Sequence, residues 1–136
     1  MVDLARRFSS LNRLYGEGAT DRLAHAHVMV VGLGGVGSWA VEALARSAVG
    51  RLTLVDMDHV AESNINRQIQ ATDANLGKSK VDALAERIAQ YAPECQVKRI
   101  DDFLTEENAG DLVSAFADSG GSVVLDCCDQ TSAKVA

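Results

Sequence analysis

The feature that most constrains this chain is a glycine-rich turn between an apolar segment and a helix-forming segment. Residues 28–37 read VMVVGLGGVG, and Asp56 follows at the end of the apolar segment RLTLVD. A strand, a glycine turn, a helix, a second strand and a terminal carboxylate, in that order, are the parts of a nucleotide-binding βαβ unit. We therefore expect a parallel sheet whose first turn can hold a phosphate group.

Each part of this unit has a mechanical role. Gly32 lets the chain leave the strand sharply, Gly34 lets a phosphate approach the backbone, and Gly37 lets the helix pack closely on the strand. The N-terminus of that helix offers unpaired N–H groups to an anion. Gly35 joins these three as a candidate cofactor-binding residue, and Asp56 can accept hydrogen bonds from ribose hydroxyls. The turn alone does not separate NAD from ATP, and a tight turn without any ligand is the structural alternative.

Strand-like and helix-like segments alternate along the chain. We expect strands over residues 27–31, 51–55, 96–100 and 122–126, and helices over residues 35–47, 78–91 and 106–117. This alternation predicts an α/β fold, a Rossmann-like, doubly wound and mostly parallel sheet. In the first of these helices, spacing suggests one packed face with Trp39 in it, made of Val36, Trp39, Ala40, Ala43, Leu44 and Ser47.

The chain is expected to have two parts. Residues 1–26 are predicted to form a helical segment broken at Gly16 and Gly18, and residues 27–136 a Rossmann-like ATP-binding domain. Residues after Asp129 look like the start of a further helix. Because a doubly wound domain usually has more strands, we expect it to continue beyond residue 136.

Composition excludes several classes of protein. The 136 residues are 47% hydrophobic, which is enough for a core, and carry a net charge of −6, which disfavours a generally basic nucleic-acid surface. No apolar run approaches the roughly 20 residues that span a bilayer, so no membrane contact is expected. The first ten residues, MVDLARRFSS, have no apolar core like that of a secretory signal, and a cytoplasmic location is the expectation. The three cysteines contain no CxxC pair, and Cys127 and Cys128 are interpreted as buried small hydrophobic residues, with a reactive thiol as the alternative. The three histidines lack ligand-like spacing and are interpreted as structural or exposed.

A long aperiodic connection, residues 57–77, holds the candidate phosphate ligands. Within SNINRQIQ, Arg67 can grip phosphate oxygens with its planar fork, and Asn64 can support it. Lys80, in the first turn of the next helix and off its apolar face, would add a second cation. A solvated polar loop and a surface lysine are the alternatives. Asp129, three residues beyond Asp126, is placed to bind Mg²⁺ through oxygen, or else to cap a helix.

Five ordered motifs resemble the adenylating domain of the ubiquitin-activating (E1-like) superfamily, which includes bacterial enzymes that adenylate sulfur-carrier proteins. The motifs are GLGGVG, LVDMD, SNINRQ, GKSK and DCCD, and they run over nearly the whole chain. The resemblance implies ATP and Mg²⁺ as cofactors, attack of a substrate carboxylate on the α-phosphate, and release of pyrophosphate. Position by position, it puts Asp56 on the ribose, Mg²⁺ on Asp129, and the phosphates on Asn64, Arg67 and Lys80.

The resemblance also implies a homodimer. Arg13, in LNRLYG, matches an arginine that reaches the ATP of the partner subunit in this superfamily. Such a residue would join Arg67, Lys80 and Asp129 in the catalytic set.

Within the superfamily, the chain is most similar to the dehydratases of threonylcarbamoyladenosine in tRNA. The segments ARRF, RLYGE, VGSWAVEALARS, LVDMDHV, PECQV and DDF carry this likeness, and Lys134 stands where the sulfur-carrier enzymes usually have arginine. It implies a tRNA substrate whose threonyl carboxylate is activated by ATP and then attacked by the neighbouring carbamoyl group. Because the chain is acidic, we expect regions outside it to bind the tRNA. A sulfur-transfer accessory protein is left open as a partner.

Three other functions remain open. The first is an adenylyltransferase for a ubiquitin-like sulfur-carrier protein, which a diglycine-ended partner would favour. The second is an NAD-dependent dehydrogenase domain, which explains the glycines and Asp56 but leaves Arg67, Lys80 and Asp129 without a role. The third is a catalytically inactive fragment that only dimerises.

Overall fold

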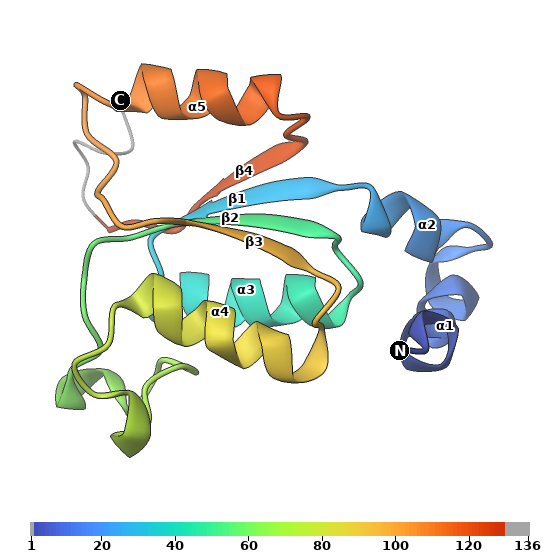
Figure 1. The fold of residues 1–136 in the computed structure, drawn as a ribbon, viewed down its shortest axis with the longest axis horizontal. Helices are drawn as coiled ribbons and strands as arrows, with labels where there is room; N and C mark the ends of the chain where they lie inside the picture. The colour runs from blue at the N-terminus through green and yellow to red at the C-terminus, as the bar shows by residue number, and fades with distance from the viewer. Residues whose placement is uncertain (1, 130–136) are drawn as a thin grey trace.

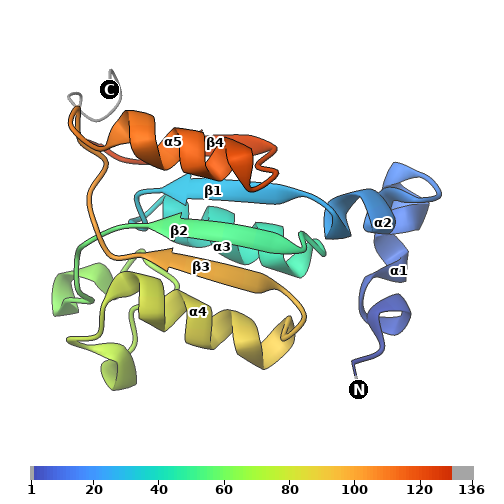
Figure 2. The ribbon, with the colours of Figure 1, turned by 45° about the horizontal axis from the view of Figure 1, so that its top comes forward.

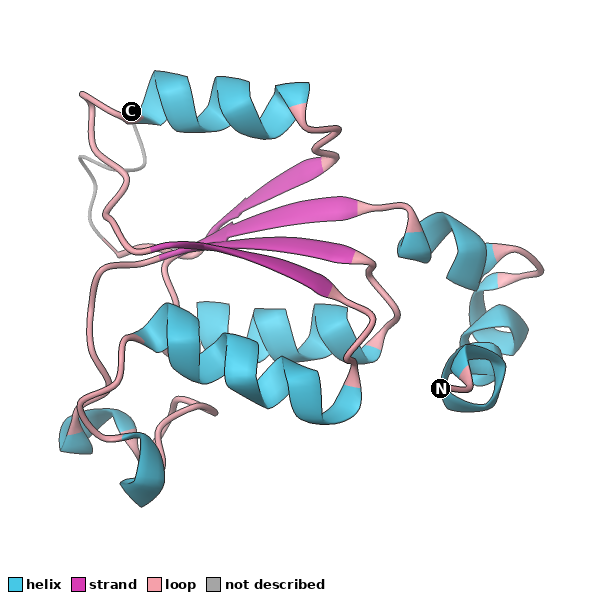
Figure 3. Cartoon of the chain, viewed as in Figure 1, coloured by secondary structure: helices cyan, strands magenta, loops and turns pink. Residues whose placement is uncertain are grey.

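The computed structural model describes residues 2–129. Four parallel strands form one sheet in the order β3-β2-β1-β4 (Figure 1). Helices α3 and α4 lie against one face of the sheet and α5 against the other, so the fold has three layers (Figure 3). This confirms the predicted Rossmann-like α/β fold. The elements are α1 (Leu4–Tyr15), α2 (Ala19–Ala24), β1 (His27–Val31), α3 (Gly37–Arg46), β2 (Arg51–Val55), α4 (Lys80–Tyr91), β3 (Gln96–Ile100), α5 (Ala109–Asp118) and β4 (Val123–Asp126).

Strand register brings the carboxyl ends of all four strands to one edge of the sheet. At that edge Val31 of β1 pairs with Val55 of β2 and with Asp126 of β4, and Val55 pairs with Ile100 of β3. In parallel α/β sheets, ligands bind beyond this edge, where the connecting loops meet. The segments that follow β1, β2 and β4 therefore share one place in the fold.

The central strands are buried on both faces. Every side chain of β1 is buried, as are four of the five in β2. Parallel strands covered by helices read as near-continuous apolar runs, which explains why HVMVV and RLTLV do not alternate with polar residues. The main core cluster joins these strands to α3 and α4 and includes Val30, Val41, Leu52, Leu84 and Ile88.

The predicted packed face of α3 is wrong. Trp39 and Val36 are 52% and 70% exposed, and the buried face consists of Gly37, Ser38, Val41, Glu42 and Ala45. The spacing of apolar residues could not reveal this rotation, because the buried face includes the polar residues Ser38 and Glu42. Their hydrogen-bond partners come from elsewhere in the chain. Trp39 instead donates its indole N–H to the Arg67 carbonyl, 2.8 Å away, and so holds the loop after β2.

Helix α5 begins later than predicted. Residues 106–108 form a turn and the helix starts at Ala109. Thr105 and Asn108 close this turn reciprocally: the Thr105 hydroxyl accepts from the Asn108 N–H at 3.3 Å, and the Asn108 side chain accepts from the Thr105 N–H at 2.8 Å. These two hydrogen bonds stabilise the turn that leads into the helix.

The N-terminal segment folds into two helices, as predicted, and lies at the amino ends of the strands (Figure 2). The break falls at Gly16 and Gly18, which both have positive φ. Arg7 of α1 donates to the Tyr91 carbonyl at 2.8 Å, which ties α1 to the end of α4. The division of the chain at residue 26 stays a prediction, and Lys134 and the helix expected after Asp129 lie outside the described residues. No helix among residues 2–129 is both long and apolar enough to span a bilayer.

A buried carboxylate joins α3 to α4. Glu42 accepts hydrogen bonds from Arg87 at 2.9 and 3.0 Å, from Arg46 at 2.8 Å and from the Tyr91 hydroxyl at 3.0 Å. Arg46 also lies over the Tyr91 ring, 4.1 Å from its centre. Burial alone would raise the pKa of Glu42, but the hydrogen bonds from Arg87, Arg46 and Tyr91 outweigh burial and lower it. The cluster fixes the two helices whose N-termini approach the carboxyl edge of the sheet.

Glu42→Ala is expected to lower the free energy of unfolding by about 2–4 kcal/mol, because half-buried donors of Arg87 and Tyr91 lose their acceptor. Denaturant unfolding at neutral pH measures this loss. Glu86→Ala is the matched control, since Glu86 forms an exposed pair with Lys78 and should cost less than about 1 kcal/mol. Equal losses in the two variants would contradict a structural role for the Glu42 cluster.

The same cluster predicts acid sensitivity. Because the pKa of Glu42 is lower in the folded state, its contribution is fully present above the ordinary glutamate pKa and is lost as the pH falls through the lowered value. The stability difference between the wild type and Glu42→Ala should therefore shrink in acid. A difference that stays constant from neutral pH into strong acid would exclude this linkage.

Candidate functional site

A cavity of about 490 Å³ lies at the carboxyl edge of the sheet. Its walls come from the turn after β1, the end of β2, the loop before α4 and the end of β4. The cavity brings together most of the residues singled out in the sequence, namely Gly32, Gly34, Gly35, Asp56, Asn64, Arg67, Lys80 and Asp129. Gly37, the first residue of α3, lies behind the turn and does not line the cavity. Arg13 does not line it either.

The glycines of the turn divide into two kinds. A Cβ on Gly32 would come within 2.8–2.9 Å of the Cys127–Cys128 backbone, and one on Gly37 would overlap the Gly32 carbonyl. These two glycines are required by the close packing of β1, α3 and β4. A Cβ on Gly34 would lie 3.7 Å from the nearest atom, and one on Gly35 would lie 3.5 Å away. The fold by itself leaves room for a side chain at these two positions, on the cavity side of the turn.

Asp56 has a role that the sequence did not reveal. Its carboxylate is buried and accepts hydrogen bonds from the Leu33 N–H at 2.8 Å and from the Asp58 N–H at 2.7 Å. It therefore ties the end of β2 to the glycine turn. Each carboxylate oxygen has further acceptor capacity, so the predicted hydrogen bonds to ribose are compatible with this anchoring and stay a prediction.

The loop after β2 is ordered by its own polar groups. It contains two short 3₁₀ helices, η1 (Glu62–Asn64) and η2 (Asp73–Asn75). The Asn64 side chain accepts from the Ala61 N–H at 2.9 Å, so this residue shapes the loop. The exposed Arg67 donates to the Ser63 carbonyl at 2.8 Å and to the Asn66 side chain at 3.2 Å. These contacts hold the Arg67 guanidinium at the rim of the cavity.

Gln70 is a supporting residue that sequence reasoning missed. It is 1% exposed, and its amide N–H group donates to the Leu33 carbonyl at 2.9 Å and to the Gln68 side chain at 3.3 Å. The oxygen of the Gln70 side-chain amide has no hydrogen-bond partner among the described residues. The only sequence signal was a pair of glutamines at alternate positions, which is too common to assign a role.

Lys80 is not a surface lysine, which was the alternative to a phosphate-binding residue. The residue is 6% exposed and lines the cavity from the first turn of α4. Ser79 caps this helix by accepting from the Asp82 N–H at 3.2 Å. The Lys80 N–H donates to the Asp58 carbonyl at 3.0 Å, and its ammonium lies 3.8 Å from the Asp58 carboxylate. A buried cation at the wall of the cavity is suited to bind an anion.

Asp129 and Arg13 lie at opposite ends of the sheet. Asp129 is exposed, follows β4 and lines the cavity. Within residues 2–129, no group of three or more His, Cys, Asp or Glu residues could hold a metal by itself. Arg13 is exposed in the last turn of α1, and this helix lies beyond the amino ends of the strands (Figure 1). The fold therefore does not bring Arg13 to the cavity of its own chain.

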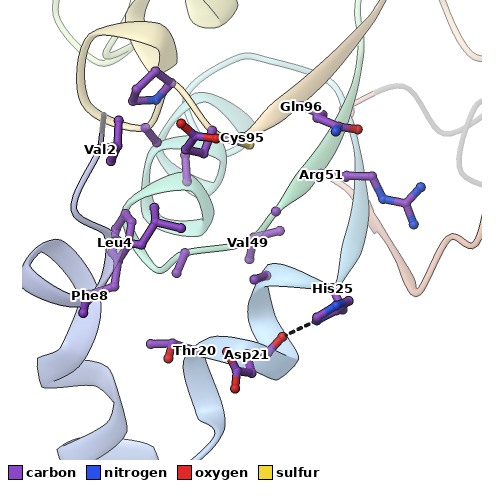
Figure 4. A pocket seen from close by; sticks show the side chains of 18 residues that line it. Val2, Leu4, Phe8, Thr20, Asp21, His25, Val49, Arg51, Cys95 and Gln96 are labelled. Atoms are coloured by element: carbon purple, nitrogen blue, oxygen red, sulfur yellow. Dashed lines mark hydrogen bonds between the residues drawn. The ribbon is translucent and has the colours of Figure 1, made fainter.

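A second cavity, of about 510 Å³, lies between the N-terminal helices and the amino ends of the strands (Figure 4). Most of its lining is apolar, and His25 contacts the Asp21 carbonyl at 2.7 Å. Burial raises the pKa of the Cys95 thiol to about 11, so this cysteine stays protonated at neutral pH. Because the second cavity contains neither a cluster of cations nor an activated nucleophile, the first cavity is the candidate site.

A glycine turn at the start of a helix, two cations and three carboxylates around one cavity define a nucleotide-binding domain of the Rossmann class. Residues 7–136 match the model of the ThiF family. The chain belongs to the ThiF family.

Individual members of the ThiF family show which of its enzymes this chain is similar to. The tRNA threonylcarbamoyladenosine dehydratase of Escherichia coli (strain K12) is 49% identical over 131 residues, which cover 96% of this chain and 47% of that enzyme. The crystal structure of the E. coli enzyme in complex with ATP has a TM-score of 0.90 at 48% identity, covering 96% of this chain and 52% of the crystallised one. The molybdopterin-synthase adenylyltransferase of Salmonella typhimurium is 37% identical over 114 residues, or 84% of this chain and 44% of that protein. The chain thus spans about half the length of these relatives.

Substitution by alanine should have different effects at the two kinds of glycine: at Gly34 it should weaken ligand binding, and at Gly37 it should lower stability. Gly34→Ala should change the free energy of unfolding by less than about 1 kcal/mol, because the fold has room for the methyl group. If the turn holds a phosphate group, the same substitution should weaken ATP binding by roughly tenfold or more, because the phosphate would have to approach the Gly34 backbone. Gly37→Ala should cost about 3 kcal/mol or more of stability, since the methyl group overlaps a fixed carbonyl.

Thermal unfolding and ATP titration of both variants check this pair of expectations. A Gly34→Ala protein that folds and binds ATP as the wild type does would contradict phosphate binding at this part of the turn.

Proposed function

We propose that this chain is the ATP-binding part of a tRNA threonylcarbamoyladenosine dehydratase, which activates the threonyl carboxylate of the modified nucleoside by adenylation. One observation carries the proposal: the glycine turn, Arg67, Lys80 and Asp129 line a single cavity at the carboxyl edge of the sheet. Membership of the ThiF family and the likeness to the E. coli dehydratase bound to ATP support it.

The residues of the cavity suit a nucleoside triphosphate. Asp56, at the end of β2, would accept from the ribose hydroxyls, and the N–H groups of the glycine turn would face the phosphates. Asn64, Arg67 and Lys80 would bind the phosphate oxygens. Adenylation depends on neutralising the phosphates and placing the carboxylate in line with the α-phosphate, more than on acid–base chemistry. Two cations next to the turn meet that need, whereas a nicotinamide cofactor does not require them.

Asp129 is the residue proposed to hold Mg²⁺. Mg²⁺ is usually bound by one or two carboxylates together with the phosphates of the substrate, so a single exposed carboxylate at the cavity fits this ion. When bound, Mg²⁺ would supply charge for the pyrophosphate leaving group. Asp129 would then orient the triphosphate as well as bind the metal.

The proposed reaction has two steps. An oxygen of the threonyl carboxylate attacks the α-phosphorus, the bond to the β-phosphate breaks, and pyrophosphate leaves. The neighbouring carbamoyl group then attacks the activated carbonyl carbon, AMP leaves with the original carboxylate oxygen, and the attacking group loses its proton to solvent. The ring that closes has therefore lost the elements of water. Arg67 and Lys80 would neutralise the charge that builds up on the phosphates in the first step.

The proposal includes a homodimer in which Arg13 reaches the ATP of the partner subunit. Arg13 is exposed and lies at the edge of the sheet opposite the cavity, so only a second copy could bring this side chain to a bound nucleotide. The tRNA would be bound largely by regions outside this acidic chain. A cytoplasmic location fits an enzyme that acts on tRNA, and a sulfur-transfer accessory protein remains a candidate partner.

A sulfur-carrier adenylyltransferase is the second candidate, favoured by the 37% identity to the Salmonella typhimurium enzyme. Both candidates use the same cavity and differ in the carboxylate that is adenylated. In a protein that includes the tRNA-binding regions, pyrophosphate release from ATP should be stimulated by tRNA that carries threonylcarbamoyladenosine and not by a diglycine-ended carrier protein. Stimulation by the carrier protein alone would favour the second candidate.

Asp129→Ala should lower ATP turnover by at least about 100-fold while leaving the fold intact, because an exposed metal ligand is lost from the cavity. Pyrophosphate release with modified tRNA measures the loss, and circular dichroism measures the fold. Asp101→Ala is the control, since this exposed aspartate follows β3 at the same edge without lining the cavity. Normal turnover by Asp129→Ala would remove this residue from the mechanism.

The shared site of the proposed homodimer can be tested by mixing two inactive variants. Arg13→Ala and Asp129→Ala should each be nearly inactive, and a mixture that exchanges subunits should recover about a quarter of wild-type activity, because one site in each mixed dimer is complete. Pyrophosphate release after mixing provides the readout. If activity does not return although the subunits exchange, Arg13 does not act across the dimer.

A further inference from the structure

Lys80 is a buried cation whose counter-charge was not identified from the sequence. Its side chain is 7% exposed, and a buried ammonium needs a nearby negative charge to offset the loss of hydration. Within residues 2–129, its one ion pair is with Asp58, whose side chain is 58% exposed and also lines the cavity. The pair therefore spans the wall of the cavity, with the cation inside and the carboxylate towards solvent.

The backbone holds Asp58 in this position. Its N–H donates to the Asp56 carboxylate at 2.7 Å, and its carbonyl accepts from the Lys80 N–H at 3.0 Å. The following residues continue the contact, since Val60 donates to the Lys78 carbonyl at 2.8 Å and Gly77 donates to the Val60 carbonyl at 2.9 Å. The end of β2 and the start of α4 are thus fixed side by side, and Asp58 cannot move far from Lys80 without breaking these bonds.

Asp58 differs from the other carboxylate at the end of β2. Both oxygens of Asp56 accept from backbone N–H groups, which stabilise its negative charge locally. The Asp58 carboxylate has only the Lys80 ammonium as an ion-pair partner among the described residues, at the rather long distance of 3.8 Å. A phosphate that enters the cavity would compete with Asp58 for this ammonium.

We propose that Asp58 is the resting counter-charge of Lys80 and that it makes nucleotide binding depend on magnesium. In the empty cavity it keeps the Lys80 side chain directed at the place where phosphates bind. It also repels a free triphosphate, whereas a triphosphate partly neutralised by Mg²⁺ can take over the ammonium. Asp58 is thus a positioning residue that selects the metal complex of the nucleotide, and this inference rests on the proposed ATP site.

The test is equilibrium titration of the protein with ATP in the presence of Mg²⁺ and, separately, in the presence of EDTA. In Asp58→Asn, the backbone bonds remain and only the charge is lost. This variant should bind free ATP about tenfold more tightly than the wild type does, while its affinity for ATP with Mg²⁺ changes by less than about threefold. Asp58→Glu, which retains the charge, should keep the wild-type dependence on magnesium.

Asp73→Asn is the matched control. Asp73 is an exposed carboxylate in η2 of the same loop and does not line the cavity, so its loss should leave both affinities unchanged. A wild-type protein that binds ATP under neither condition would contradict the proposed ATP site itself. Given wild-type binding, an unchanged affinity of Asp58→Asn for free ATP would overturn the inference. Loss of ATP binding only with Mg²⁺ would overturn it too, because Asp58 would then be a metal ligand.

Discussion

The close approach of three backbone segments is the constraint on which the rest of this structure depends. The turn after β1, the first residue of α3 and the segment after β4 meet at Gly32 and Gly37, where no side chain would fit. This contact fixes the rotation of α3, which buries Glu42 and leaves Trp39 exposed. It also points the N-terminus of α3 into the cavity, where unpaired N–H groups can face an anion.

Hydrogen bonds from two other segments hold the glycine turn in place without a ligand. Asp56 accepts from the Leu33 N–H, and Gln70 donates to the Leu33 carbonyl. The first contact comes from the end of β2 and the second from the loop that carries Arg67, so one residue of the turn links three parts of the site. A site whose supporting groups are already hydrogen bonded loses less conformational entropy on binding. The loop after β2 is therefore part of the binding site and also a support for the turn.

Sequence-based prediction was correct where the signal lies in neighbouring residues. The four strands, the glycine turn and the grouping of Asp56, Arg67, Lys80 and Asp129 followed from apolar runs, breaks and motif order. It failed where tertiary contacts decide: the buried face of α3 contains Glu42, whose partners lie 45 and 49 residues away in Arg87 and Tyr91. The burial of Lys80 and the anchoring role of Gln70 depend on how a long aperiodic loop folds back, which no periodicity encodes. The pairing of Lys80 with Asp58 arises in the same way.

Calorimetric titration of the protein with ATP and Mg²⁺, and separately with NAD⁺, tests the central claim most directly. The account predicts saturable binding of ATP and none of NAD⁺, because the cavity offers two cations, and Asp129 as a candidate metal ligand, around a phosphate-binding turn. Binding of NAD⁺ without binding of ATP would contradict it.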